Sequence, residues 1–387
     1  MNQNASYQKN AAYLVLITTA IFLMLFPVGV VILAPFIAIV YKTRNPVPIF
    51  LFIIICSFSF SIIYSSSDIF SSRDFIAYEA YYKCVNGFSN SLSCEEFLIG
   101  FYFLNKLVGF LGEIEPVNLS ILFKFIIFFI LYLSTYYYIN KQYKIKNLLF
   151  VVVFSCLLMR NGSIALLYRQ SLATVFIVML VCNRQKIQTF LLYLASISFH
   201  ITSIVLAPIT KYCLSKTANP KLIFTITFIL PVSFILGLGD LIYNNSPPFL
   251  ARKIYFMLEP TGVAGLGDFI TGYAIFMPVA IFSFFDVFFG TVFFSRKYNR
   301  EKKLLLITGL FWMIMSMIVP HSFRLLFPMV LVFSSIFSVV LLNSTKDKLA
   351  FCLCFFCMVF VSNARFLSPI LFDIMPAFSL EPFFYLR

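Results

Sequence analysis

Charge and histidine are scarce in this sequence. Only 11% of its 387 residues are charged and 61% are hydrophobic, whereas a soluble domain has about 25% charged and about 45–50% apolar residues. The sequence also has no glycine-rich phosphate loop, no paired-carboxylate metal signature and no Ser-His-Asp order. No metal and no cofactor are therefore expected. The composition predicts an all-α fold, a polytopic integral membrane protein with a single domain over residues 1–387.

The basic residues do not form a stripe of the kind that binds nucleic acid. The net charge is +14, but it is spread over short linkers between apolar runs, as in the cytoplasmic loops of membrane proteins. We therefore expect membrane lipids among the partners and no nucleic acid. The first apolar run, Ala11–Tyr41, is too long for the core of a cleavable signal peptide.

The apolar runs predict the membrane-spanning helices. A span needs about 20 apolar residues, and the sequence predicts about 10–12 spans. They are expected near Ala12–Val40, Phe50–Tyr64, Leu119–Ile139, Leu148–Met159, Ile164–Val181, Leu222–Leu238, Phe269–Phe294, Leu304–Val319, Phe323–Leu342 and Leu349–Phe366.

The basic linkers predict which face each connection reaches, because positive charge favours the cytoplasmic side. Cytoplasmic linkers are expected at Lys42/Arg44, Lys141/Lys144/Lys146, Arg184/Lys186, Arg296/Lys297/Arg300/Lys302/Lys303 and Lys346/Lys348. The outer face then receives the N-terminus, Ser65–Asn118, Arg160–Ser163, Gly239–Asp268, Pro320–Ser322 and the C-terminal tail.

Two stretches do not fit a simple alternation of spans. Glu95–Gly112 is apolar but short, and we interpret it as a helix in the outer interface, with Glu95 and Glu96 at its N-terminal end. Thr189–Ile209 has basic residues at both ends, so either one linker breaks the charge rule or the segment is re-entrant with its tip near His200. A re-entrant turn requires a protein cavity beside it.

Five charged or titratable residues lie inside or at the ends of apolar runs: Arg160, Arg169, His200, His321 and Arg324. An arginine at mid-bilayer costs about 2.5–3.5 kcal/mol on insertion scales, so such groups normally face a polar cavity. Arg160 and Arg169 are suited to bidentate binding of a phosphate or diphosphate; the alternative is that they reach lipid headgroups. His200 is either a catalytic group or a structural histidine.

The first outer loop gathers acidic, basic and aromatic residues. Tyr78 and Tyr81 follow Asp74 at helical spacing, a pattern that suits the binding of sugar rings. An interfacial helix with a tyrosine belt is the alternative. Cys84 and Cys94 bracket a polar part of this loop, and we predict a disulfide between them if the loop lies in an oxidising compartment.

The order of short motifs resembles a known family. Arg73, Asp74, Tyr78 and Tyr81 come first, and Cys94-Glu95-Glu96-Phe97, Arg169-Gln170-Ser171-Leu172-Ala173, Phe199-His200-Ile201-Thr202-Ser203 and Arg324-Leu325-Leu326-Phe327 follow. This order is similar to that of the EpsG-like and Wzy-like polysaccharide polymerases of bacterial envelopes, from about Asp68 to Phe327.

The resemblance implies a multi-pass glycosyltransferase of the bacterial inner membrane with its active site facing the periplasm. It would join undecaprenyl-diphosphate-linked oligosaccharide repeat units into O-antigen (lipopolysaccharide) or capsular or exopolysaccharide chains, beside a chain-length regulator and a flippase. The expected diphosphate-binding residues are Arg169, Arg160, Arg324 and Arg73. The expected catalytic residues are His200 or Asp74 as the base and His321 as an orienting group, and Tyr78, Tyr81, Glu95 and Glu96 are expected at the sugars.

Two other functions fit part of this pattern. A flippase or transporter of lipid-linked oligosaccharide would also need arginines for the diphosphate, but along a path open to both faces. An O-antigen ligase differs from a polymerase mainly in its acceptor. Glycan analysis of a deletion strain distinguishes a polymerase from a flippase. Loss of a polymerase leaves lipid cores capped by one repeat unit, whereas loss of a flippase leaves lipid cores without any repeat unit.

Overall fold

The computed structural model describes residues 27–66, 73–88, 98–215, 273–318 and 327–372, with residues 219, 225, 229 and 244. These residues form helices and turns, and no strand occurs among them, which confirms the all-α prediction for this part of the chain. Two helices, Pro46–Ser65 and Pro116–Gln142, are long and apolar enough to cross a membrane, and several shorter apolar helices accompany them. The predicted number of spans stays a prediction.

The chain divides into two compact units. Unit 1 comprises Met1–Cys182, Leu194–Ile201 and Ser362–Arg387, and unit 2 comprises Asn183–Tyr193 and Thr202–Val361.

Unit 1 is a helical bundle centred on α6. Its helices are α2 (Pro27–Val40), α3 (Pro46–Ser66), α4 (Arg73–Asn86), α5 (Ile99–Gly109), α6 (Pro116–Gln142), α7 (Leu148–Leu158), α8 (Asn161–Leu166) and α9 (Tyr168–Cys182). Prolines begin α3 and α6, where their fixed φ and missing N–H are tolerated. The Asn147 side chain caps α7 by accepting a hydrogen bond from the Phe150 amide at 3.3 Å. α6 packs against α3, α7 and α9.

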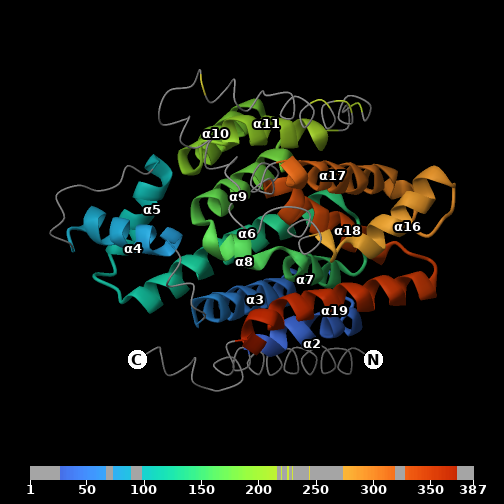
Figure 1. Ribbon diagram of the computed structural model, residues 1–387, viewed down its shortest axis with the longest axis horizontal. Helices are drawn as coiled ribbons and strands as arrows, with labels where there is room; N and C mark the ends of the chain where they lie inside the picture. Colours follow the sequence, from blue (N-terminus) through green and yellow to red (C-terminus); the bar gives the residue numbers. More distant parts are fainter. Residues whose placement is uncertain are drawn as a thin grey trace, which may run out of the picture. The chain divides into compact units, whose positions relative to one another are not determined.

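One end of this bundle brings together α3, α4, α6, α8 and α9. Lys124 near the start of α6 contacts Tyr64 and Ser65 at the end of α3, and Phe123 packs on Tyr168 at the start of α9. α8 contacts α3, α6 and α9, and α4 contacts the same α6 (Figure 1). We call this the arginine end, because Arg160 precedes α8 and Arg169 is the second residue of α9. Lys141 lies at the opposite end of α6, and the membrane face that each end reaches stays a prediction.

The predicted continuous helix Ile164–Val181 is wrong. The structure divides it at Leu167 into α8 and α9. The Ser171 hydroxyl donates a hydrogen bond to the Ile164 carbonyl at 3.1 Å, while the Ser171 amide bonds to Leu167 at 2.9 Å. A side chain thus satisfies a carbonyl at the end of α8, and a new helix N-terminus forms beside Arg169.

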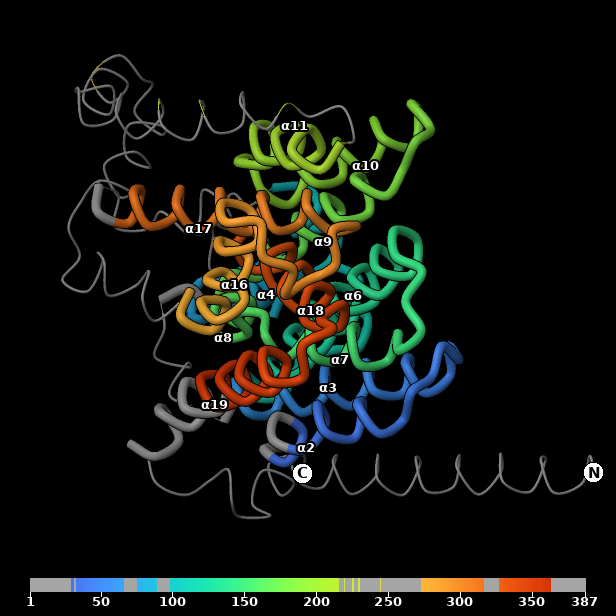
Figure 2. The backbone as a smooth tube through the Cα atoms, turned by 90° about the vertical axis from the view of Figure 1, so that its right-hand side faces the viewer, coloured from blue at the N-terminus to red at the C-terminus, as the bar shows by residue number. Residues whose placement is uncertain are grey.

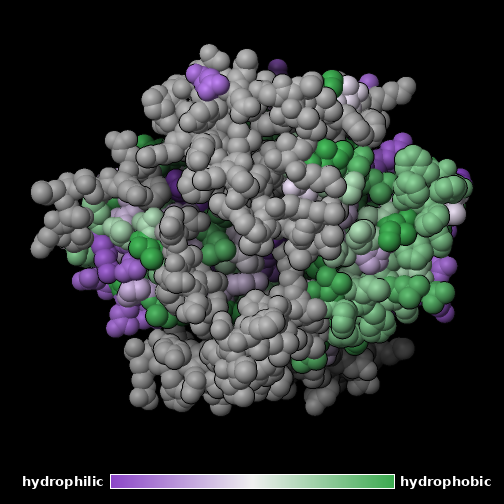
Figure 3. Space-filling view, viewed as in Figure 1, coloured by the Kyte–Doolittle hydropathy of each residue, from purple (hydrophilic) through white to green (hydrophobic). Residues whose placement is uncertain are grey.

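Unit 2 contains most of α10 (Lys186–Phe199), α11 (Ser203–Cys213), α16 (Met277–Phe288), the short 3-10 helix η3 (Arg296–Tyr298), α17 (Asn299–Ile318), the π-helical turn η5 (Pro328–Phe333), α18 (Ser334–Asn343) and most of α19 (Lys348–Phe372). α17 packs between α16 and α18. Apolar side chains gather on the surface over α16 (Figure 3), among them Phe284, Phe285 and Phe288, which are 43%, 42% and 67% exposed. Such a surface suits contact with lipid.

α10 and α11 form a helical hairpin, as one of the two interpretations of Thr189–Ile209 predicts (Figure 2). The Tyr193 hydroxyl donates to the Ile204 carbonyl at 3.1 Å, and Lys211 Nζ donates to Thr189 Oγ1 at 3.0 Å, so the helices run antiparallel. At 14 and 11 residues they are about 21 and 17 Å long, short of the roughly 30 Å of a bilayer core. The membrane depth of the hairpin stays a prediction.

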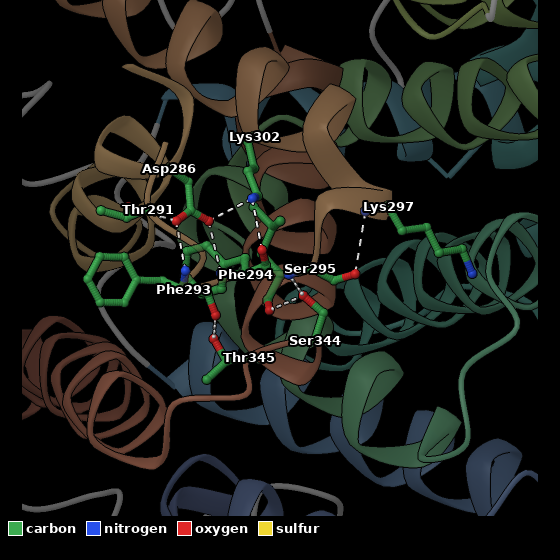
Figure 4. A network of polar contacts seen from close by, with 10 residues as sticks. Asp286, Thr291, Phe293, Phe294, Ser295, Lys297, Lys302, Ser344 and Thr345 are labelled. Atoms are coloured by element: carbon green, nitrogen blue, oxygen red, sulfur yellow. Dashed lines mark hydrogen bonds and ion pairs between the residues drawn. The ribbon is translucent and has the colours of Figure 1, made fainter. Parts of the chain in front are cut away.

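A buried ion pair corrects two further expectations (Figure 4). Lys302, expected in a cytoplasmic linker, is 1% exposed and lies 2.6 Å from the Asp286 carboxylate. The same carboxylate accepts hydrogen bonds from the Phe293 and Phe294 amides at 2.7 and 2.9 Å. The helix predicted over Phe269–Phe294 therefore ends at Phe288, because Asp286 holds the following segment in a turn; at Gly290 φ is +72°, which glycine tolerates.

Candidate functional site at the arginine end of unit 1

Stacked aromatic rings form the base of the candidate site. The Tyr78 ring of α4 stacks on Tyr168 of α9 with 4.7 Å between centroids, and Phe101 of α5 lies 5.2 Å from Tyr78. Phe123 of α6 packs on Tyr168 at 5.9 Å, and all four rings are buried. Four helices therefore meet in one aromatic cluster, which fixes the start of α9 with respect to α4, α5 and α6.

Arg169 lies against this cluster. Its guanidinium carbon is 6.0 Å from the centroid of the Tyr78 ring, within the range of a cation–π contact. The side chain is half-buried and its Nε atom is buried. Because α9 begins at Tyr168, Arg169 lies in the first helical turn, where the helix dipole adds positive potential. Guanidinium and helix N-terminus together favour an anionic ligand.

Lys124 is a buried cation that the sequence analysis missed. Its ammonium donates hydrogen bonds to the Tyr64 carbonyl at 2.6 Å, to Ser120 Oγ at 2.7 Å and to Ser65 Oγ at 3.2 Å. It also lies 5.9 Å from the ring of Phe75, which follows Asp74 in α4. The signal was available, because a lysine inside the predicted span Leu119–Ile139 is as costly as the arginines that were noticed.

Arg160 lies between α7 and α8 at the same end. It is half-buried and precedes Asn161, which is buried. The Asn161 side chain accepts a hydrogen bond from the Tyr132 hydroxyl at 2.7 Å and donates one to the Cys156 carbonyl at 3.2 Å. These bonds hold the turn between α7 and α8, in which Arg160 lies, against both α6 and α7.

His200 follows the last residue of α10 and belongs to unit 1. The preceding Phe199 ring stacks on Phe176 of α9, with 5.5 Å between centroids and 16° between planes. Phe176 is seven residues, or about two turns, after Arg169 on the same helix. The residue before His200 therefore packs on α9, the helix whose first turn carries Arg169, and the shared site of His200 and Arg169 stays a prediction.

Tyr78 and Tyr81, predicted to bind sugars, are each 5% exposed. The Tyr81 ring stacks on Phe101 at 5.9 Å, so the ring faces of both tyrosines contact protein. Burial raises the pKa of Tyr81, so its hydroxyl is protonated around neutral pH. Their sugar-binding role stays a prediction; what the structure shows is that Tyr78 supports Arg169.

The other predicted site residues are described incompletely. Arg73 and Asp74 begin α4, but only their backbone is described. The residues outside the described part of the chain are His321, Arg324, Glu95 and Glu96. Within the described ranges, no group of three or more His, Cys, Asp or Glu side chains could hold a metal ion.

Cys84, near the end of α4, is disulfide-bonded. Of the nine cysteines, seven are free: Cys56, Cys156, Cys182, Cys213, Cys352, Cys354 and Cys357. The ninth is Cys94, the predicted partner, which lies outside the described residues. The part of the disulfide prediction that concerns Cys84 is therefore confirmed.

The described residues are helical, and two of their helices are long and apolar enough to cross a membrane, which is consistent with a membrane protein. The chain matches the EpsG family over residues 70–376, and it belongs to this family. Family membership indicates a role of the polysaccharide-polymerase type in a membrane. Among curated proteins and solved structures, nothing matches.

Proposed function

We propose that this protein joins undecaprenyl-diphosphate-linked oligosaccharide repeat units into an O-antigen, capsular or exopolysaccharide chain at the outer face of the inner membrane. The growing glycan is transferred from its carrier diphosphate to the terminal sugar of the next lipid-linked unit. Such a donor is already activated by its leaving group, so the protein needs cations for the diphosphate and a base for the acceptor hydroxyl.

The observation that supports this proposal most strongly is the environment of Arg169. Its guanidinium lies 6.0 Å from the centroid of the buried Tyr78 ring. Arg169 is in the first turn of α9, which begins where an apolar segment is interrupted between two helices. A headgroup-anchoring arginine needs neither the ring nor the helix N-terminus. Both favour a bound anion, and the fork of the guanidinium matches two phosphate oxygens.

The proposed reaction assigns each site residue a step. Arg169 and Arg160 hold the donor diphosphate, with Arg324 and Arg73 as further cations. His200 or Asp74 accepts the proton of the acceptor hydroxyl while the oxygen of that hydroxyl bonds to the anomeric carbon of the donor. The bond from that carbon to the diphosphate oxygen breaks, and the arginines stabilise the charge on the departing diphosphate. His321 orients the base or the acceptor.

The test is Arg169→Lys, which keeps the charge and loses the planar fork. In a deletion strain, the wild-type gene should restore long surface glycan and Arg169→Lys should leave cores with one repeat unit, while the variant protein accumulates normally. Arg184→Lys, at an exposed linker position, is the matched control and should restore long chains. Long chains from Arg169→Lys contradict the assignment. Loss of every repeat unit in the deletion strain indicates a flippase instead.

A further inference from the structure

α5 contacts both parts of the proposed site through two consecutive residues. Phe101 packs on Tyr78 at 5.2 Å, on Tyr81 at 5.9 Å and on Phe123 at 6.1 Å, which places it in the cluster that supports Arg169. Gly100, the residue before it, faces the end of α10 next to His200. One helix therefore touches the Arg169 cluster and the His200 turn at adjacent positions.

The contact at Gly100 leaves no room for a side chain. A Cβ atom there would lie 2.6 Å from Ser198 Oγ, 2.9 Å from the Ser198 carbonyl oxygen and 2.9 Å from Cδ2 of Phe199. Non-bonded heavy atoms in protein cores pack about 3.5–4.0 Å apart, so these distances require a shift of the neighbours. Only glycine allows α5 to approach the backbone of α10 this closely.

The neighbours of Gly100 are themselves held in place. The Ser198 hydroxyl donates a hydrogen bond to the Ala195 carbonyl at 2.7 Å, and the Phe199 ring stacks on Phe176 of α9. The carbonyl oxygen of Ser198 is backbone and cannot rotate away. A side chain at position 100 would therefore displace the turn that precedes His200, and a change of rotamer would not relieve the contact.

α5 is also fixed to α4 on its other side. Asn86 of α4 donates a hydrogen bond to the Asn105 carbonyl at 3.1 Å, and Lys106 Nζ donates to the Val85 carbonyl at 2.6 Å. With α4 and the Phe101 contacts fixed, α5 cannot move away from α10 to accommodate a larger residue. The displacement must appear at the His200 turn.

We infer that Gly100 is a positioning residue for His200. Through the close contact at Gly100, α5 sets the distance between the turn at His200 and α9, the helix whose first turn carries Arg169. This inference rests on the proposed function and takes His200, of the two candidate bases His200 and Asp74, as the group that acts on the acceptor hydroxyl, while Arg169 binds the donor diphosphate. A change at Gly100 should move the base and leave the anion site in place. The turnover number should then fall without a matching change in the Michaelis constant for the lipid-linked donor.

The experiment measures kcat and KM of the full-length protein in lipid nanodiscs with lipid-diphosphate-linked repeat units. We compare wild type, Gly100→Ala, His200→Ala and the double variant. Gly100→Ala should lower kcat by roughly 10- to 100-fold, because a misplacement of about 1 Å can cost on the order of 10²-fold, with KM within about twofold. In the double variant kcat should equal that of His200→Ala, since Gly100 acts through His200.

Two further variants control for folding. Phe103→Ala changes the same helix at a position that is 63% exposed, and it should leave kcat and KM unchanged. If Gly100→Ala does not accumulate, Phe199→Leu tests the same contact from α10 by removing the ring that faces Gly100. It should also lower kcat and leave KM unchanged.

The outcomes separate this inference from the proposed function. An active wild type with full kcat in Gly100→Ala or in His200→Ala overturns the positioning role alone. Multiplied losses in the double variant also overturn it, because they show that Gly100 acts elsewhere. A wild type without polymerising activity overturns the proposed function and this inference together.

Discussion

Units 1 and 2 both bury cations, but they surround them differently. Lys302 of unit 2 meets a carboxylate at 2.6 Å, and Asp286 also accepts two amide hydrogen bonds. Arg169 of unit 1 lies over an aromatic ring, and Lys124 donates to two hydroxyls and a carbonyl. The pair in unit 2 balances its own charge and closes a turn. The contacts given above for Arg169 and Lys124 are with a ring and with neutral oxygens, and the helix N-terminus at Arg169 adds positive potential, which suits a site that attracts an anion.

The two surroundings also differ in how far apart along the chain their contacting residues lie. The contacts of the Asp286 carboxylate join residues at most 16 positions apart, and the adjoining Phe293 carbonyl accepts a hydrogen bond from Thr345, 52 positions away, at 3.1 Å. The Arg169 cluster combines residues of α4, α5, α6 and α9. A local network stabilises one turn, whereas a cluster drawn from four helices forms only when the bundle has assembled.

The largest effect is expected when the charge balance of unit 2 is broken. Lys302→Met leaves the Asp286 carboxylate buried without its cation, which should lower stability by about 3–5 kcal/mol. Asp286→Asn added to Lys302→Met removes the second charge and keeps an acceptor oxygen, so much of the stability should return. Thermal denaturation of the detergent-extracted protein measures both. A double variant no more stable than Lys302→Met would falsify the charge-balance explanation.

A smaller effect is expected from the covalent closure at Cys84. Cys84→Ser should lower stability by about 2–3 kcal/mol, because a disulfide that closes a loop of about ten residues restricts the unfolded chain by that amount. Cys352→Ser, at an exposed free cysteine, is the matched control. The comparison is made by thermal denaturation with and without reductant. Equal stability of the two variants under oxidising conditions contradicts a structural role for the bond.

The smallest effect on stability is expected at Tyr78. Tyr78→Leu removes a stacked aromatic pair worth about 0.5–1.5 kcal/mol and a cation–π contact to a half-buried arginine worth about 0.5–1 kcal/mol. Tyr78→Phe keeps the ring and should retain near wild-type stability and activity. If Tyr78 supports Arg169, Tyr78→Leu should also lower polymerisation by roughly tenfold, equivalent to about 1.4 kcal/mol. Equal activity of the leucine and phenylalanine variants would show that the ring does not support the arginine.

The sequence was sufficient to predict a feature of the structure where a single residue conflicted with the residues around it in the sequence. Arg169 and Arg160 were found because arginine is costly in an apolar run. The hairpin of α10 and α11 was one of two interpretations, because basic residues at both ends of Thr189–Ile209 broke the alternation of charge. The same cost argument, applied to Lys124, would have predicted a polar contact at the start of α6.

The sequence was insufficient wherever a feature depends on contact between distant segments. The break at Leu167 depends on the hydrogen bond from Ser171 to Ile164, inside a segment that is apolar throughout. Lys302 was placed in a surface linker because charge counting does not show that Asp286 is its partner. The close approach at Gly100 joins residues about a hundred positions apart and has no local sequence signal.

The bond at Cys84 has a consequence for how the protein is made. Disulfides form in oxidising compartments and are rare in the cytosol, so in the outward orientation that the proposed function requires, this bond closes after α4 has crossed the membrane. Tyr78, which supports Arg169, lies six residues before Cys84 in the same helix. The oxidation state of Cys84 thus records the orientation in which each molecule was inserted. A copy inserted the wrong way round would keep a free thiol there, and quality control could distinguish it from a correctly inserted one.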